Sequence, residues 1–128
     1  MKTKEEIEQG LHGFIGTEQY WPTVRSDVVM TDGVRWLSEA ADCPWLIEAI
    51  CAYQPQARKN RGTAQGQFWK FVKDGKDGGT LQCGSGSRRA KPVVEKQFVN
   101  VNFPVDNIQL YCMDNHDGRW VILLPGEY

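Results

Sequence analysis

Residues 31–53, which read TDGVRWLSEAADCPWLIEAICAY, constrain the fold most because they hold the densest apolar pattern of the chain. One helical face carries its apolar residues at i, i+3 and i+7: Val34, Leu37 and Ala41. Thr31 or Asp32 is able to cap this helix. Pro44 suits the first turn of a second helix, since proline lacks the N–H that has no partner there. The pattern predicts two consecutive helices, the second ending at Pro55.

The second half of the chain carries strand patterns instead. Short runs rich in apolar residues, most of them alternating with polar ones, are typical of strands: 67–72, 80–83, 93–103, 108–113 and 120–124. Turn signals such as the Asp-Gly pairs of residues 73–79 separate them. Helices followed by strands predict an α+β fold, in which N-terminal helices pack on one face of a four- to five-stranded antiparallel sheet.

The length of 128 residues fits a single domain, residues 1–128, with a mainly helical part at 1–55 and a mainly β part at 66–128. The start of the chain, MKTKEEIEQG, has no apolar run, and no stretch is long enough to span a bilayer. We therefore expect a cytoplasmic protein with no membrane partner. The oligomeric state stays open, although an edge strand at residues 80–83 would allow dimerisation by strand addition.

The four cysteines show no metal-binding or redox spacing. Cys43, Cys51, Cys83 and Cys112 form no C-x-x-C pair, and no histidine stands at zinc-finger spacing from them. We expect buried free thiols, with no metal and no cofactor.

The chain resembles a small bacterial and mobile-element family through six short motifs, which follow one another in the order found in that family. The family is known only as an uncharacterised domain. The motifs are TEQ at 17–19, TDGV at 31–34, WLI at 45–47, WKF at 69–71, FPVDNIQLY at 103–111 and the terminal LPGEY at 124–128. The chain departs from the family pattern at Pro44, where the family has an aromatic residue, and at Gly126, where it usually has serine. The resemblance implies a fold of the predicted kind and implies no activity.

An enzyme is one alternative interpretation. Five side chains would support acid–base chemistry if the fold brought two of them together: Asp32, Glu39, Glu48, His12 and His116. The sequence contains no nucleophile elbow, no H-E-x-x-H and no phosphate loop. We assign no catalytic residue, and the enzyme alternative is a small hydrolase or transferase with a site between helices and sheet.

We expect a non-enzymatic protein-interaction module with an unidentified protein partner. The resemblance also implies a mobile-element setting, and from it we expect an accessory role, such as counter-defence. Aromatic and basic side chains are the usual anchors of interfaces, and the candidate partner-binding residues are Tyr20, Trp21, Arg88, Arg89, Lys91 and Tyr128. The terminal Glu127–Tyr128 pair predicts either a C-terminal latch, in which a carboxylate meets a basic group, or a recognition tail.

Nucleic-acid binding through two basic loops is a further alternative. Both loops are rich in arginine and lysine: Arg58, Lys59 and Arg61 in one, and Arg88, Arg89 and Lys91 in the other. The net charge of −1 and the pI of about 6.1 argue against this interpretation, since nucleic-acid-binding domains are typically basic.

Overall fold

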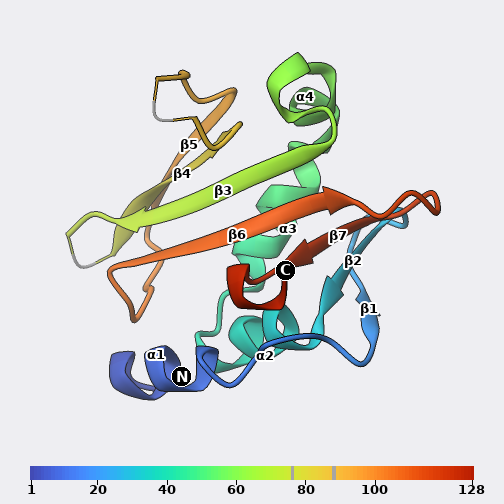
Figure 1. Ribbon diagram of the computed structural model, residues 1–128. Coiled ribbons are helices and arrows are strands. Elements are labelled where there is room, and N and C mark those ends of the chain that lie inside the picture. Colours follow the sequence, from blue (N-terminus) through green and yellow to red (C-terminus); the bar gives the residue numbers. More distant parts are fainter. Residues whose placement is uncertain (76, 88) are drawn as a thin grey trace.

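The computed structural model describes residues 1–75, 77–87 and 89–128, and it contains a seven-stranded sheet (Figure 1). In chain order the strands are β1 (Tyr20–Pro22), β2 (Val28–Thr31), β3 (Gly66–Lys73), β4 (Gly78–Gly84), β5 (Val94–Val99), β6 (Asn107–Asp114) and β7 (Trp120–Leu123). Their order in the sheet is β1-β2-β7-β6-β3-β4-β5, and β2 and β7 pair in parallel. The α+β class is confirmed, but the prediction of four or five antiparallel strands is wrong.

The two additional strands come from the N-terminal part of the chain. β1 lies outside the runs predicted as strands, and it pairs with β2 through the register Trp21↔Met30. β2 then lies beside β7, with Val29 opposite Val121. Their separation in the sequence permits a parallel pair, whereas a tight hairpin would impose an antiparallel one.

Two details of the strand predictions are also wrong. The strand predicted at 93–103 forms as β5, but it ends at Val99, because Asn100 has a φ of 59° and turns the chain out of the sheet. Residues 80–83 do not form an edge, since β4 pairs with β3 on one side and with β5 on the other. The edge strands of the sheet are β1 and β5.

The helices are α1 (Lys4–Leu11), α2 (Asp32–Ala40), α3 (Pro44–Ala52) and α4 (Gln54–Lys59), with short 3₁₀ turns η1 (Arg61–Thr63) and η2 (Pro125–Glu127). Thr31 caps α2, its hydroxyl accepting from the Val34 N–H at 3.3 Å, and Pro44 opens α3 as predicted. Pro55 does not end the helical region. It lies in the first turn of α4, where its missing N–H costs nothing.

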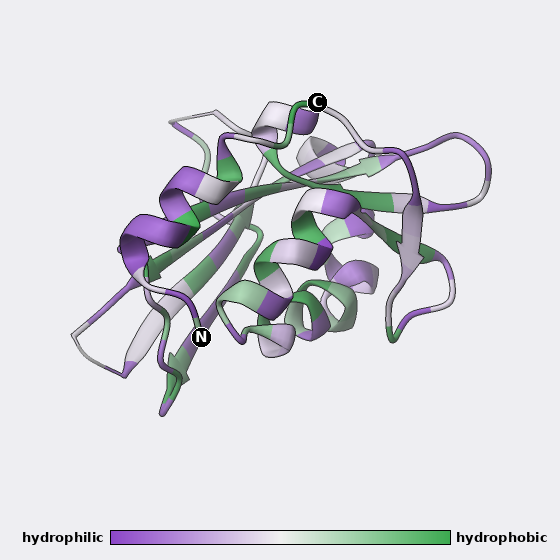
Figure 2. Ribbon diagram, turned by 90° about the horizontal axis from the view of Figure 1, so that it is seen from below, coloured by the Kyte–Doolittle hydropathy of each residue, from purple (hydrophilic) through white to green (hydrophobic). Residues whose placement is uncertain are grey.

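The core lies between α3 and one face of the sheet. Trp45 of α3 packs its ring 5.3 Å from that of Phe71 on β3 and 5.0 Å from that of Phe98 on β5. Phe71 is fully buried, and Phe103, from the loop before β6, packs against it at 5.2 Å. Figure 2, seen from below, shows helices grouped beside one face of the strands. The opposite face of the middle strands is thereby left open.

Candidate functional site

The open face of the sheet carries the alternate side chains of the middle strands. On β3, the buried Trp69 and Phe71 alternate with the exposed Phe68, Lys70 and Val72. The burial pattern of β6 and β4 alternates in the same way, and it leaves Gln109 and Gln82 exposed. Since successive side chains of a strand point to opposite faces, these exposed side chains share the face opposite to α3.

Three aromatic rings follow one another across this face, and we call Phe68, Tyr111 and Tyr128 the aromatic row. Phe68 on β3 lies directly opposite Tyr111 on β6, with ring centroids 4.9 Å apart. Tyr128, just after η2, packs edge-on against Tyr111 at 5.9 Å. Tyr128 remains 78% exposed and Phe68 36% exposed. Such exposed rings are typical of interaction sites rather than of a packed core.

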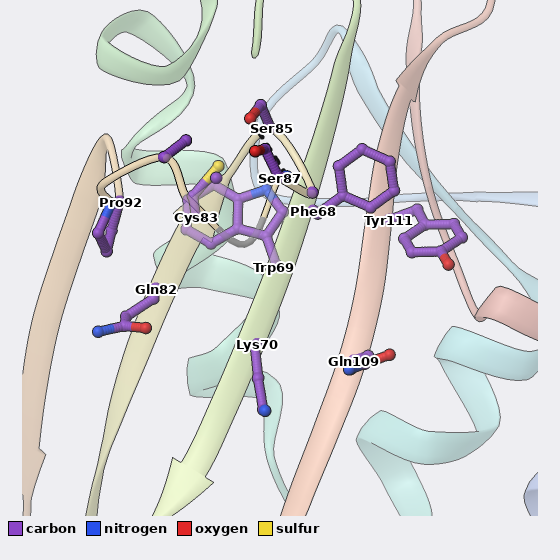
Figure 3. A pocket seen from close by; sticks show the side chains of 13 residues that line it. Phe68, Trp69, Lys70, Gln82, Cys83, Ser85, Ser87, Pro92, Gln109 and Tyr111 are labelled. Carbon is purple, nitrogen blue, oxygen red and sulfur yellow. Dashed lines mark hydrogen bonds between the residues drawn. The ribbon is translucent and has the colours of Figure 1, made fainter. Parts of the chain in front are cut away.

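A hollow of about 810 Å³ lies beside the aromatic row, over β3, β4 and β6 (Figure 3). Phe68 and Tyr111 stand side by side at one end, and Lys70 lies farther along the strands with Gln82 and Gln109. Ser85, Ser87 and Pro92, from the segment after β4, form another wall. Among the described residues that line the hollow, Lys70 carries the only charge.

Gly86 lets the segment after β4 approach the Phe68 ring. Its φ is +87°, a conformation that L side chains rarely adopt. A Cβ at this position would also lie 3.1 Å from two ring atoms of Phe68. Glycine therefore allows this segment to border the hollow without pushing the ring away.

The two aromatic residues predicted at β1 have different surroundings. Tyr20 is 41% exposed, and the Arg119 guanidinium lies 5.2 Å from its ring centroid. Trp21 is occupied internally, because its indole N–H donates to Asp32 Oδ1 at 2.8 Å and the Arg35 guanidinium lies 3.7 Å from its ring centroid. Tyr20 is thus the more accessible of the two to a partner.

The predicted basic residues also separate into two groups. Arg89 and Lys91 are exposed beside the hollow, whereas Arg88 lies outside the described residues. Arg58 turns inward, with Nη1 2.7 Å from Asp27 Oδ2. The Arg58 guanidinium holds the pKa of the Asp27 carboxyl below its usual range. Arg58 therefore forms an ion pair within the fold and is not available to a partner.

The five acid–base candidates are not brought together. Asp32 accepts from the Trp21 indole and from the Glu18 N–H, and the indole contributes most to a lowered pKa of this carboxyl. Glu48 lines a separate apolar hollow of about 260 Å³ beside β1, α2 and α3. In the part of the chain that the structure describes, no hydrogen bond joins any two of the candidates, which are Asp32, Glu39, Glu48, His12 and His116.

The C-terminal latch forms, but with a different partner from the one predicted. Glu127 meets the first turn of α2 rather than a basic group: its carboxylate accepts from the Thr31 hydroxyl at 2.6 Å and from the Gly33 N–H at 3.1 Å. It also accepts from the Leu124 N–H at 3.0 Å. A Cβ on Gly33 would lie 2.6 Å from Leu124 Cδ1. The TDGV and LPGEY motifs therefore meet in space, and they fix Tyr128 at the open face.

Sequence reasoning missed Phe68, Lys70, Gln82, Gln109 and Tyr111 as site residues. A signal for them existed, because the alternation of residues 67–72 already placed Phe68 and Lys70 on the same side of a strand. What it lacked was the register between β3 and β6, which brings Phe68 and Tyr111 together.

The four cysteines are free and buried, as expected. Burial raises the pKa of the Cys43 and Cys83 thiols to about 12, and it also raises the pKa of Cys51 and Cys112. In the described part of the chain, no three histidine, cysteine or acidic side chains lie close enough together to hold a metal ion.

We expect the native thiols to react slowly with a thiol reagent at neutral pH. The thiolate is the reactive form, and a raised pKa lowers its fraction while burial excludes the reagent. Colour development with an aromatic disulfide should be slow in buffer, and all four thiols should react promptly in denaturant. Prompt reaction of the native protein would contradict the buried placement of the cysteines.

Residues 5–128 match the model of DUF6876, a family of unknown function, and the chain belongs to this family. The resemblance to an uncharacterised domain family is thereby confirmed. Comparisons with curated proteins and with solved structures gave no match. None of the helices in the described residues combines the length and apolar character needed to cross a membrane.

Proposed function

We propose that the chain is a non-enzymatic binding module that takes its partner on the open face of the sheet. The observation that carries the proposal is the exposure of the aromatic row next to a hollow of about 810 Å³. Aromatic side chains in a partly enclosed setting are frequent anchors of binding. Polar groups that would orient a bound partner surround the hollow: the amides of Gln82 and Gln109 and the ammonium of Lys70.

The separation of the acid–base candidates supports a binding role over a catalytic one. A general base must lie within hydrogen-bond reach of its reacting group and is usually oriented by a further side chain. Asp32 is instead occupied by Trp21, and Glu39 lies 3.5 Å from Arg35 in an exposed ion pair. The accessory role and the cytoplasmic location stay predictions.

Blocking the open face should abolish capture of a partner. Because the native cysteines are buried, a single introduced thiol is selectively modified by a bulky maleimide polymer. Gln109→Cys places the polymer on the open face, and Glu48→Cys places it on an exposed position of α3 as the matched control. Immobilised conjugates are incubated with a lysate of the source cells, and captured protein and nucleic acid are measured separately.

We expect the Gln109→Cys conjugate to capture no more than bare resin and the Glu48→Cys conjugate to match the unmodified chain. Equal capture by the two conjugates, including none by either, would contradict the proposal. Circular dichroism of each conjugate verifies that the fold is retained.

A further inference from the structure

We propose that the partner of the open face is single-stranded nucleic acid, whose bases stack on the aromatic row and whose phosphates contact basic residues beside the hollow. This inference rests on the proposed function and names the chemical class of its partner. It depends on the charge distribution, on the rings and on the polar groups of the hollow.

The charge of the chain is strongly segregated, although its net value is −1. Residues 49–73 and 78–94 contain eight lysines and arginines and no aspartate or glutamate, whereas the rest of the chain carries seven basic and 16 acidic residues. The two basic stretches build β3, β4, α4 and the segment that follows β4. The hollow is therefore made largely from the basic part of the molecule, where the local field favours a polyanion.

The two basic loops lie next to each other in space. Gln56 Nε2 on α4 donates to the Val93 carbonyl at 2.9 Å, and a Cβ on Gly62 would lie 3.3 Å from Ser85 Cβ. These contacts gather four exposed side chains at the end of the sheet that carries α4 in Figure 1, and we call them the basic border: Lys59, Arg61, Arg89 and Lys91. Ser85 itself lines the hollow, so the basic border adjoins it.

The opposing charge on the open face is small. Glu95 on β5 lies next to Gln82, and its Oε2 accepts from Gln82 Nε2 at 2.8 Å. Lys70 lies on β3 within the hollow. Lys70 and the basic border together thus offer phosphates more positive charge than the single negative charge of Glu95 offsets.

The aromatic row favours a single strand over a duplex. Base–aromatic stacking needs a base whose flat face is free, and in a duplex the neighbouring base pairs cover that face. Tyr128 offers a largely exposed ring, and the Phe68 ring is partly exposed. Gln82, Gln109 and the Ser87 hydroxyl lie in reach of the same hollow and are suited to hydrogen bonds with base edges.

An acidic polypeptide would meet the same positive charges, but it would offer the rings no series of planar partners. Its backbone would also find no strand to pair with on this face, because the hydrogen bonds of β3 are already made with β4 and β6. Peptide strands usually add to a sheet edge instead.

The test is fluorescence anisotropy with labelled oligomers of thymidine, of uridine and of duplex DNA, each about 12 units long, within the roughly 4–16 nucleotides typical of small single-strand binders. We expect at least one single-stranded oligomer to bind about tenfold more tightly than the duplex. The two single-stranded probes distinguish DNA from RNA as the source of the ligand. Raising the salt concentration should weaken binding, as counterions compete for the phosphate contacts.

Two pairs of variants separate stacking from charge. Tyr128→Leu removes an exposed ring of the row, and we expect the dissociation constant to rise roughly tenfold, whereas Val24→Ala, which shortens an exposed apolar side chain beside the separate hollow of α2 and α3, should change it less than about twofold. Arg89→Glu should weaken binding by at least about tenfold, and the exposed Lys2→Glu, with the same charge change, by less than about twofold. Melting curves establish that each variant is folded.

The inference is overturned if single-stranded probes bind no more tightly than duplex, if Tyr128→Leu and Arg89→Glu match their controls, or if an acidic polyglutamate displaces the oligomer as efficiently as unlabelled thymidine. The last result would assign the face to an acidic polypeptide. In each of these cases, the polymer-blocking experiment would still decide independently whether the open face is a binding surface.

Discussion

Replacement of Glu127 by alanine is expected to lower the free energy of unfolding by about 3 kcal/mol, since hydrogen bonds to a charged group contribute roughly 1.5–3 kcal/mol each and Glu127 is only half-buried. The substitution removes the acceptor of the Thr31 hydroxyl and of the Gly33 N–H. The Gly33 N–H belongs to the first turn of α2, where backbone donors have no partner within the helix.

Urea unfolding followed by circular dichroism measures this effect. Glu127→Gln keeps an oxygen acceptor and should lose less stability than Glu127→Ala. The exposed Glu8→Ala on α1 is the matched control and should remain within about 0.5 kcal/mol of the unmodified chain. If Glu127→Ala unfolded at the same urea concentration as the Glu8→Ala control, the latch would not hold α2.

Replacement of Gln67 by leucine is expected to cost a similar amount, about 3 kcal/mol, because buried donors left without acceptors cost roughly 1–3 kcal/mol each. Gln67 is fully buried on β3. Its Oε1 accepts from Trp69 Nε1 at 2.8 Å and from Gln54 Nε2 at 2.9 Å, and its Nε2 donates to Gln54 Oε1 at 3.0 Å. Leucine fills a similar volume but offers neither acceptor nor donor.

The same unfolding measurement tests this prediction. Gln109→Leu makes the same chemical change on the open face of β6 and should alter stability by no more than about 0.5 kcal/mol. Equal midpoints for Gln67→Leu and Gln109→Leu would show that the buried amide pair contributes no stability.

The sequence predicted the helical pair correctly because Pro44 and the apolar spacing are local signals. β1 was missed for a physical reason. It contains three residues, too few for alternation to be visible, and it pairs with β2, which in turn pairs with β7 far along the chain. Pro55 was misread because a proline ends one helix and begins the next with equal ease.

The site was only partly predictable. Tyr128 was a candidate because it belongs to the terminal motif. Its contact with Tyr111 was not predictable, because it depends on η2 folding back against β6. The carboxylate of Glu127 accepts mainly from backbone N–H groups, and a pattern of residue types does not predict such contacts. The residues of the basic border were visible in the sequence, but the net charge of −1 argued against nucleic acid because acidic residues elsewhere cancel them in the sum, and the contact between the two loops comes only from the fold.

The most direct test of the open face as a nucleic-acid site is a map of the amide chemical shifts of isotope-labelled protein during titration with a thymidine oligomer. We predict that the shifted signals belong to β3, β6 and residues 84–92, together with Tyr128. Shifts confined to α2 and α3, or no shift at saturating oligomer, would contradict the assignment of this face.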